Sequence, residues 1–459
     1  MCFRSSAWCT MINTLYLPEI REMLEEEDEL GLREFCTALH PGRTADYMAG
    51  LDPGERWRVL RHADPFLRAQ IFIYFDHDSQ VGLIESQDRQ EVADLIANLP
   101  PDDRVDLLED VDPAVIEELM PLLPQEERWD ILRLQAYPED TAGAIMTSDV
   151  AKLPETLTVR EALNELGRQS QDLETIYYLY VVDEHDHLRG VVSARQLVSR
   201  LGKPDTRLVE LMEDDVVAAH VADDQEDVAR KVARYNLLAI PVVDDEYRML
   251  GIVTHDDVID VMREEATEDA HRIAAVAPLE DTYLKTHLVT LSWKRGMWLA
   301  ILFFTGCLTA FAMRHYSSIQ QQWVWLAWFV PLIISSGGNS GSQAATLVIT
   351  ALATGDVTLA DWYQVVRREL LVGVMLGGFL GAIGFVGGLI VLHSFHDAII
   401  LPCTLLLVVT CGTMTGSLLP LVLRRLGLDP TLMSNPFVAA VMDILGIVIY
   451  MRIAMLFLE

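Results

Sequence analysis

The sequence is poor in cysteine, with six cysteines among 459 residues. None of them forms a CxxC pair, and three of the six lie in apolar segments. Disulfide frameworks and cysteine zinc sites depend on closely spaced cysteines. The sequence therefore indicates neither.

Basic residues are also scarce, because 35 Lys and Arg stand against 68 Asp and Glu, for a formal net charge of −33. A nucleic-acid surface requires clustered basic side chains, so we expect no nucleic-acid partner. The acidity fits cation binding, but it fits a plain solvated surface equally well.

Motifs of catalysis are missing as well. No nucleophile–base set, phosphate loop or zinc motif occurs, and GGNSG at 337–341 lacks the GK[ST] of a phosphate loop. We therefore predict that the chain is not an enzyme. The first apolar run is too short for a secretory signal, and either Met1 or Met11 fits as the start.

Charge and hydrophobicity are segregated along the chain. The part of the chain before Trp293 carries 27 of the 35 basic and 61 of the 68 acidic residues. Five apolar segments follow, each long enough to cross a hydrocarbon core of about 30 Å; they are 294–313, 324–350, 369–392, 399–423 and 436–458. The pattern predicts an acidic soluble half and a five-helix, all-α membrane domain over 293–459.

The basic residues near these segments predict an orientation. With a cytosolic N-terminus, the positive-inside rule holds for the three basic pairs, and the C-terminus then lies outside. The inward residues are Lys294, Arg295, Arg367, Arg368, Arg424 and Arg425, against Arg314 and Arg452 outward. We expect a multi-pass protein of the cytoplasmic membrane.

The soluble half contains two internal repeats. Similar segments begin at positions 51, 75, 99 and 123, which predicts an all-α superhelical domain over 21–138, after an extension over 1–20. YVVDEHDHLRGVVSARQLV (180–198) matches PVVDDEYRMLGIVTHDDVI (241–259) position by position, without a gap. Each copy predicts a strand, an acidic turn, a strand opening at Gly190 or Gly251, and a helix.

These two copies resemble a tandem pair of CBS domains, an α/β module placed here at 139–263. A long acidic helix is predicted over about 255–277 and a second helical piece over 280–292, so that 264–292 connects the module to the membrane.

Asp443 lies in the middle of the last apolar segment. A lone carboxylate there costs about 2.5–3.5 kcal/mol on insertion scales. Small residues share its helix face and the membrane half offers no deep basic partner, which favours an ion pathway over a structural carboxylate. Two further patterns occur in other apolar segments. The polar run 335–341 predicts a closely packed or pore-lining break, and a glycine stripe in the third segment predicts helix packing.

The order of helical repeats, CBS pair, acidic helix and five spans resembles the MgtE family of magnesium channels. PLIISSGGNSGSQAATLVITALATGD (331–356) and GLDPTLMSNPFVAAVMDILGIVIY (427–450) are similar to that family's signatures. The resemblance implies a homodimeric Mg²⁺ pore in which Asp443 is the pore carboxylate. The full set of pore candidates is Asp443, Asp429, Asn435, Asn339 and Glu369; for Glu369 and Asp429, ordinary interfacial charge remains an alternative.

THDDVIDVMREEATEDAHRI (254–273) repeats acidic residues at spacings of three and four. Like charges at these spacings repel on one helix face, and a cation would relieve the repulsion. A solvated acidic helix is the alternative. The resemblance implies cytosolic Mg²⁺ sites, and the candidates are Asp257, Asp260, Glu265, Glu268, Asp269, Asp224 and Glu226.

The CBS resemblance also implies ATP or another adenine nucleotide as a ligand. Thr254 and Asp257 match the usual ribose-contacting pattern, whereas the first copy has Ser193 and Gln196 there. We therefore expect at most one nucleotide site.

Together these features predict a Mg²⁺-selective channel that cytosolic Mg²⁺ closes. Two alternatives remain open. One is a cation-coupled or broader transporter that also accepts Mn²⁺ or Co²⁺, and the other is a membrane-bound CBS sensor that conducts nothing.

Overall fold

The computed structural model describes residues 15–169, 173–279, 283–432 and 435–458. It divides into two units, residues 1–262 and residues 263–459. Most of the predicted N-terminal extension lies outside the described residues.

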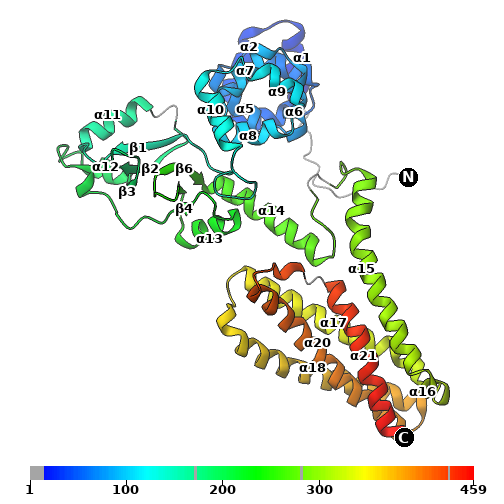
Figure 1. Cartoon of the computed structure of the whole chain (residues 1–459). Coiled ribbons are helices and arrows are strands. Elements are labelled where there is room, and N and C mark those ends of the chain that lie inside the picture. The colour runs from blue at the N-terminus through cyan, green and yellow to red at the C-terminus, as the bar shows by residue number, and fades with distance from the viewer. Residues whose placement is uncertain (1–14, 170–172, 280–282, 433–434, 459) are drawn as a thin grey trace. The chain divides into compact units, whose positions relative to one another are not determined.

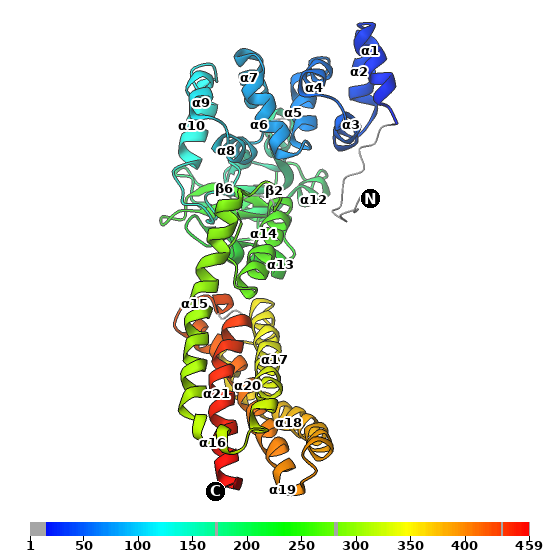
Figure 2. The same ribbon diagram turned by 90° about the vertical axis from the view of Figure 1, so that its right-hand side faces the viewer.

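The described part of the first unit begins with ten short helices (Figures 1 and 2). The odd-numbered helices from α3 begin at Pro41, Pro65, Arg89 and Pro113, and the even-numbered helices from α4 begin at Pro53, His77, Pro101 and Gln125. Both series advance by the same constant step as the sequence pattern, which confirms the predicted repeat. The helices are α1 (Leu17–Glu25), α2 (Glu29–Ala38), α3 (Pro41–Met48), α4 (Pro53–Leu60), α5 (Pro65–Ile73), α6 (His77–Ser86), α7 (Arg89–Ile96), α8 (Pro101–Glu109), α9 (Pro113–Leu119) and α10 (Gln125–Leu134).

The repeat also explains how the short helices end. A side chain from the next helix donates to one of the last carbonyl groups of the helix before it. Arg56 Nε donates to Met48 O at 3.2 Å, Gln80 Nε2 to Phe72 O at 3.0 Å and Arg104 Nε to Ile96 O at 3.0 Å. These donors satisfy carbonyl groups that a helix end leaves unpaired.

The CBS pair follows as two three-stranded sheets, in the orders β1-β2-β3 and β4-β5-β6. In each sheet the first pair of strands is parallel and the second is antiparallel. The elements are β1 (Val150–Pro154), α11 (Val159–Gln169), β2 (Thr175–Val182), β3 (Leu188–Ser193), α12 (Ala194–Ser199), β4 (Ala219–His220), α13 (Gln225–Tyr235), β5 (Ala239–Val243), β6 (Met249–Thr254) and α14 (His255–Ile273). Strands β3 and β6 begin at matched positions of the two copies, and each begins slightly before the glycine at which we expected it to open.

Those glycines permit each sheet to pair with a segment that enters from outside it. A Cβ at Gly251 would lie 2.4 Å from Thr147 O, and one at Gly190 would lie 2.8 Å from Glu213 O. Thr147 pairs with Ile252, and Glu213 pairs with Val191. The matched glycines therefore make room for a crossing backbone.

The connecting region differs from the prediction. Helix α14 ends at Ile273, where Val276 N donates to His271 O and Ala275 takes a left-handed backbone conformation with φ of 59°. This hydrogen bond closes the helix before the predicted end at about 277. The second helical piece expected over 280–292 is also wrong for residues 283–287, because the next helix begins only at Leu288.

The second unit contains five long helices among its described residues, with two short helices between them. They are α15 (Leu288–His315), α16 (Ser317–Gln322), α17 (Leu326–Ala353), α18 (Trp362–Leu392), α19 (Phe395–Ala398), α20 (Ile400–Arg425) and α21 (Asn435–Leu458). Four of the five long helices are long and apolar enough to cross a membrane. The fifth, α17, falls short because the polar and glycine run 335–341 lowers its hydropathy. It is nevertheless one continuous helix, so the break predicted there is wrong.

The glycine stripe of α18 packs against α20, as expected. Its members are buried; they are Gly373, Gly377, Gly381, Gly384 and Gly388. A Cβ at Gly377 would lie 2.8 Å from the Leu406 Cα atom, which is backbone and cannot turn aside. The stripe therefore brings the two helix backbones into contact.

We expect Gly377→Val to lower the unfolding free energy of the full chain in detergent by about 1–3 kcal/mol, because overpacking separates α18 from α20. Gly378→Val is the matched control, since a Cβ at Gly378 meets nothing within 4 Å. Thermal unfolding measures both variants. Equal midpoints in the two would contradict the packing role.

Candidate ion pathway and acidic cluster

Asp443 lies half-buried in the middle of α21. One turn before it, Ala439 contacts the position of Gly338, where a Cβ would lie 3.4 Å from the Ala439 Cβ. Just after it on the helix, a Cβ at Gly446 would lie 3.9 Å from the Ile334 Cα. Small residues thus bring α21 close to α17 one turn before and one turn after the carboxylate.

Helix α17 presents a polar stripe along the same contact. Ser335, Asn339, Ser342 and Thr346 follow one another at spacings of four, three and four, which places them on one helix face. Asn339 Nδ2 donates to Ser335 Oγ at 3.3 Å. Ser342 Oγ lies 3.1 Å from the backbone oxygen of Asn435, and Thr346 Oγ1 lies 3.1 Å from Asn435 Oδ1. Asn435 therefore bonds across the α17–α21 contact, whereas Asn339 bonds within α17 and its side chain is exposed.

The glycines of α17 have a different role from its polar residues. A Cβ at Gly412 would lie 2.5 Å from Gly337 O, and one at Gly416 would lie 2.0 Å from Gly341 O. These glycines let α17 and α20 approach backbone to backbone. Both predicted roles therefore occur in the run 335–341: its glycines pack closely against α20, and its polar side chains form the polar stripe.

Glu369 and Asp429 lie elsewhere in the unit. Glu369 lies on α18, and its backbone oxygen accepts a hydrogen bond from Thr413 Oγ1 at 3.3 Å. Asp429 forms an ion pair with Arg272 and accepts hydrogen bonds from the backbone and hydroxyl groups of Thr431. The structure therefore gives Asp429 a basic partner that the sequence pattern did not indicate.

The end of α14 contacts the candidate pathway. Arg272 also pairs with Glu268, and Ile273 packs against a buried cluster of Ala345, Ile349 and Val438 on α17 and α21. Arg272 thus forms ion pairs with both Asp429 and Glu268, and Glu268 is one of the predicted regulatory residues.

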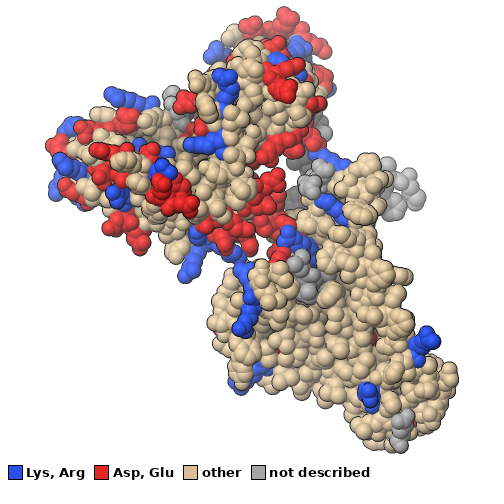
Figure 3. Space-filling view, in the orientation of Figure 1, with Lys and Arg blue, Asp and Glu red and all other residues tan. Residues whose placement is uncertain are grey.

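Asp257 at the start of α14 belongs to a second group of acids within the first unit. We call it the α8–α14 acidic cluster; it consists of Asp102, Asp103, Glu174, Asp256 and Asp257. Asp102 Oδ1 is buried and has no hydrogen-bond partner among the described residues. Figure 3 shows acidic side chains gathered over the first unit, whereas the visible face of the second unit is largely uncharged.

Burial and mutual repulsion raise the pKa of these acids. Loss of hydration, followed by the charges of Asp257 and Asp256, raises the pKa of Asp103 to about 6. Loss of hydration at the carboxyl group, followed by Asp257 and Asp103, raises the pKa of Glu174 to about 7. The pKa of Asp102 is raised well above its usual range, and that of Asp257 is also raised, in each case chiefly by burial. Such carboxylates favour a bound cation, which would supply the missing positive charge.

The other regulatory candidates have local roles or lie along α14. Asp224 caps α13 by accepting from Glu226 N at 2.9 Å, and the Glu226 side chain pairs with Arg230 at 3.2 Å. The remaining three lie further along α14; they are Asp260, Glu265 and Asp269. The structure thus joins Asp257, not Asp224 or Glu226, to acids of the repeat domain.

Thr254 and Asp257, the nucleotide candidates, cap α14 together. Thr254 Oγ1 lies 2.5 Å from Asp257 Oδ2, and Thr254 N donates to the same oxygen at 3.2 Å. Ser193 and Gln196 form the equivalent capping box on α12. Capping alone therefore accounts for these residue types in both copies.

Sequence reasoning missed Asp102, Asp103 and Glu174. PPDD at 100–103 has the pattern of a helix start, with proline and acids in the first turn. Asp102 and Asp257 are far apart in the chain, and only the folded unit brings them together. Paired changes at these positions in related sequences are the signal that could have linked them.

The raised pKa values predict a pH dependence of stability without metal. Asp103 and Glu174 bind more protons folded than unfolded between their usual pKa values of 3.8 and 4.5 and the folded values of about 6 and 7. Metal-free stability of the first unit should therefore rise as the pH falls from about 8 to about 5. Mg²⁺ should stabilise the unit more at the higher pH. Thermal unfolding of the full chain with a chelator measures this, and an undiminished pH response in Asp103→Asn/Glu174→Gln would contradict it.

Family models match three parts of the chain, which together cover most of it. A model described as a divalent cation transporter matches residues 330–453, one described as the MgtE intracellular N domain matches residues 39–140, and the CBS domain matches residues 142–203 and 208–264.

Three similar proteins illustrate the match. The magnesium transporter MgtE of Thermus thermophilus is 43% identical over 331 residues, 71% of this chain and 72% of that protein. The magnesium transporter MgtE of Enterococcus faecalis is 35% identical over 440 residues, 95% of this chain and 96% of that protein. The crystal structure of the soluble part of a magnesium transporter has a TM-score of 0.52 and 35% identity, over 54% of this chain and 97% of that chain.

These relatives are transporters, which confirms that the chain is a transporter and not an enzyme. They also confirm the fold class, with a helical N domain, a CBS pair and a helical membrane region. The chain belongs to the MgtE family of magnesium transporters.

Proposed function

We propose that this magnesium transporter works as a homodimeric channel whose pathway runs along the α17–α21 contact, past Asp443. The observation that carries the proposal is a half-buried carboxylate in the middle of α21, a helix that packs on α17 through small residues and bonds to its polar stripe through Asn435. In a single chain Asn339 is exposed, so this stripe is available to face a second copy.

Two facing copies of Asp443 suit Mg²⁺. This ion prefers oxygen ligands and loses its water reluctantly, so carboxylates can hold it through its hydration shell. The paired negative charges would also concentrate cations in a narrow, weakly screened passage. Asn339 and Asn435 would contact the water shell, while Asp429 and Glu369 would act nearer the membrane edge.

Cytosolic Mg²⁺ would close the channel through α14. At high Mg²⁺, ions bound by the α8–α14 acidic cluster and by Asp260, Glu265, Glu268 and Asp269 would fix α14. Its last residues contact α17 and α21, and Arg272 pairs with Asp429. At low Mg²⁺, the repulsion among the carboxylates would favour another arrangement. This is a population shift by a ligand that prefers the closed state.

We also propose five crossings of the cytoplasmic membrane, with a cytosolic N-terminus and the C-terminus outside. The three inward basic pairs carry this orientation. An impermeant thiol reagent should label Glu459→Cys only from outside, and labelling only from the cytosolic side would reverse the assignment.

Mg²⁺ flux into liposomes without a proton gradient tests the proposed function. The full chain should admit Mg²⁺ down its own gradient. Flux that requires a proton gradient would instead favour a coupled carrier, and no flux under either condition would favour a sensor. Competition with Mn²⁺ and Co²⁺ in the same assay measures selectivity.

An adenine nucleotide such as ATP is a further proposed ligand of the second CBS copy. Because Asp257 serves the Thr254 cap and the acidic cluster together, Mg²⁺ and nucleotide should influence each other's binding. ATP binding to the full chain by equilibrium dialysis should weaken in Thr254→Val. Unchanged ATP binding in this variant would show that Thr254 is not part of a nucleotide site.

A further inference from the structure

The turn between β2 and β3 holds a group of side chains that the Mg²⁺ mechanism does not use. Asp183, His185 and His187 each offer one ligand atom, and these atoms all lie within 4.8 Å of one another. Among the residues that the structure describes, this is the group of three that meets this spacing. It contains two imidazoles, which distinguishes it from the acidic groups of α8 and α14.

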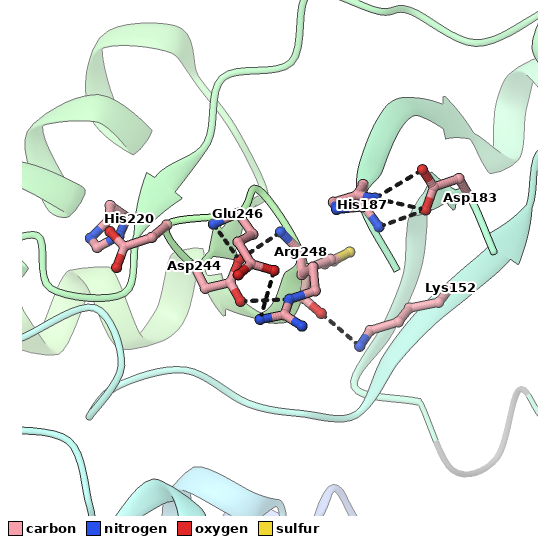
Figure 4. A network of polar contacts seen from close by, with 9 residues as sticks. Lys152, Asp183, His187, His220, Asp244, Glu246 and Arg248 are labelled. Carbon is pink, nitrogen blue, oxygen red and sulfur yellow. Dashed lines mark hydrogen bonds and ion pairs between the residues drawn. The ribbon is translucent and has the colours of Figure 1, made fainter. Parts of the chain in front are cut away.

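Asp183 shapes the turn. Its Oδ1 atom accepts from His185 N at 2.9 Å. Asp183 also holds His187, because Oδ1 accepts from His187 N at 3.0 Å and Oδ2 lies 2.9 Å from His187 Nδ1 (Figure 4). Partial loss of hydration opposes ionisation, but these hydrogen bonds prevail and lower the pKa of Asp183 to about 2. The group therefore presents a permanent carboxylate beside two imidazoles whose ring centroids lie 6.0 Å apart.

The second CBS copy serves as an internal comparison. Asp244 holds the equivalent turn by accepting from Glu246 N at 3.0 Å and Arg248 N at 2.8 Å. Asp186 and Tyr247, which occupy matched positions of the two copies, both have a left-handed backbone with φ of 63° and 64°. The turn is thus formed without histidine, so the fold does not require His185 or His187.

The two turns differ in what their side chains can bind. In the second copy, Arg248 pairs with Asp244 at 2.9 Å and with Glu246 at 3.2 Å, which closes the turn with an internal ion pair (Figure 4). In the first copy, His187 takes the place of Arg248, and His185 takes the place of Glu246. A neutral imidazole can bind a metal ion, whereas a guanidinium cannot.

We propose that Asp183, His185 and His187 bind one transition-metal dication such as Zn²⁺, Co²⁺ or Ni²⁺, at a site separate from the sites of Mg²⁺. Imidazole nitrogen suits these metals, while Mg²⁺ prefers oxygen. Three protein ligands on an exposed turn leave a position for water.

Neighbouring charges set the conditions for binding. Arg189 Nη2 lies 3.1 Å from Asp183 Oδ2 and competes with the metal for that oxygen, which favours modest affinity. On the neighbouring elements, Lys152 donates to Met249 O at 2.8 Å, and its positive charge interacts with Asp186.

The site has a structural consequence for the CBS pair. The two turns are joined by hydrogen bonds from Leu188 N to Tyr247 O at 3.0 Å and from Met249 N to Asp186 O at 2.9 Å. A metal held by the first turn would therefore stiffen the junction between the two copies. The inference extends beyond the proposed channel function, since it requires neither conduction nor Mg²⁺ gating.

Calorimetric titration of Zn²⁺ into the untagged full chain tests the proposal. The titration is made at about pH 7.5 in excess Mg²⁺, which occupies the oxygen sites. We expect one Zn²⁺ per chain with micromolar affinity, and a loss of at least tenfold in His185→Gln and in His187→Gln. His220→Gln is the matched control, because His220 is a CBS histidine outside this turn that pairs with Asp245 at 3.1 Å.

Unchanged Zn²⁺ affinity in both turn variants, or an equal loss in His220→Gln, would overturn the proposal. A second measurement uses the wild-type chain alone, in case a variant fails to fold. Co²⁺ added in excess Mg²⁺ should give the visible absorption of nitrogen coordination. A spectrum of hydrated Co²⁺ only would overturn the proposal as well.

Discussion

Asp443→Ala is expected to reduce Mg²⁺ flux nearly to the level of empty liposomes. The side chain is the acidic group in the middle of α21, the helix that bonds through Asn435 to the polar stripe of α17. Removing both copies from a dimer would remove the charge that holds a hydrated ion in the passage. Ion flux into liposomes, normalised to the amount of folded protein, measures the effect.

Asp443→Asn separates charge from hydrogen bonding. An amide keeps an oxygen that can bond to the ion's water, so flux should fall less than in Asp443→Ala. Asp397→Ala is the control, because Asp397 lies on the short helix α19, outside the α17–α21 contact. Wild-type flux in both Asp443 variants would mean that this carboxylate is only structural.

Asp102→Asn combined with Asp257→Asn is expected to weaken inhibition by cytosolic Mg²⁺ at least tenfold, with little change in flux at low Mg²⁺. The two acids come from the repeat domain and from the start of α14, and each has a pKa raised by burial and nearby charge. Asparagine has nearly the same shape as aspartate but carries no charge, so it removes the repulsion between carboxylates that a bound cation would relieve. The Mg²⁺ concentration for half-inhibition is the quantity to measure.

Two comparisons sharpen this prediction. Neutralising Asp260, Glu265 and Asp269 together should also weaken inhibition, because they continue the acidic course of α14. Asp205→Asn should leave it unchanged, since Asp205 is a highly exposed acid that pairs with Arg160 at 3.3 Å. An unaltered half-inhibition concentration in both the double and the triple variant would exclude these acids as the regulatory site.

Features with a local physical cause could be predicted from the sequence. Asp and Pro recur at the helix starts with the period of the repeat. The helix pairs of the repeat domain could therefore be predicted from the recurring segments and their capping residues. The packing role of the α18 glycine stripe could also be predicted, because the spacing of the glycines places all of them on one helix face.

Contacts between distant residues could not be predicted in this way. Arg272 meets Asp429 although the two are far apart in the chain, and Asp102 meets Asp257 only when the repeat domain and CBS pair are folded as one unit. The early end of α14 depends on the left-handed conformation of Ala275, a residue type that normally favours helix. Local sequence patterns do not specify such tertiary contacts or backbone conformations.

In the proposed mechanism, a single pore contains Asp443 and is closed by cytosolic Mg²⁺. Current from inside-out membrane patches, with the cytosolic face perfused and no proton gradient, measures both properties in one recording. We expect Mg²⁺ current at low cytosolic Mg²⁺, reversible loss of that current at millimolar Mg²⁺, and no current in Asp443→Ala. Current that persists in Asp443→Ala would show that the pore lies elsewhere, and current that is insensitive to cytosolic Mg²⁺ would show that this ion does not close it.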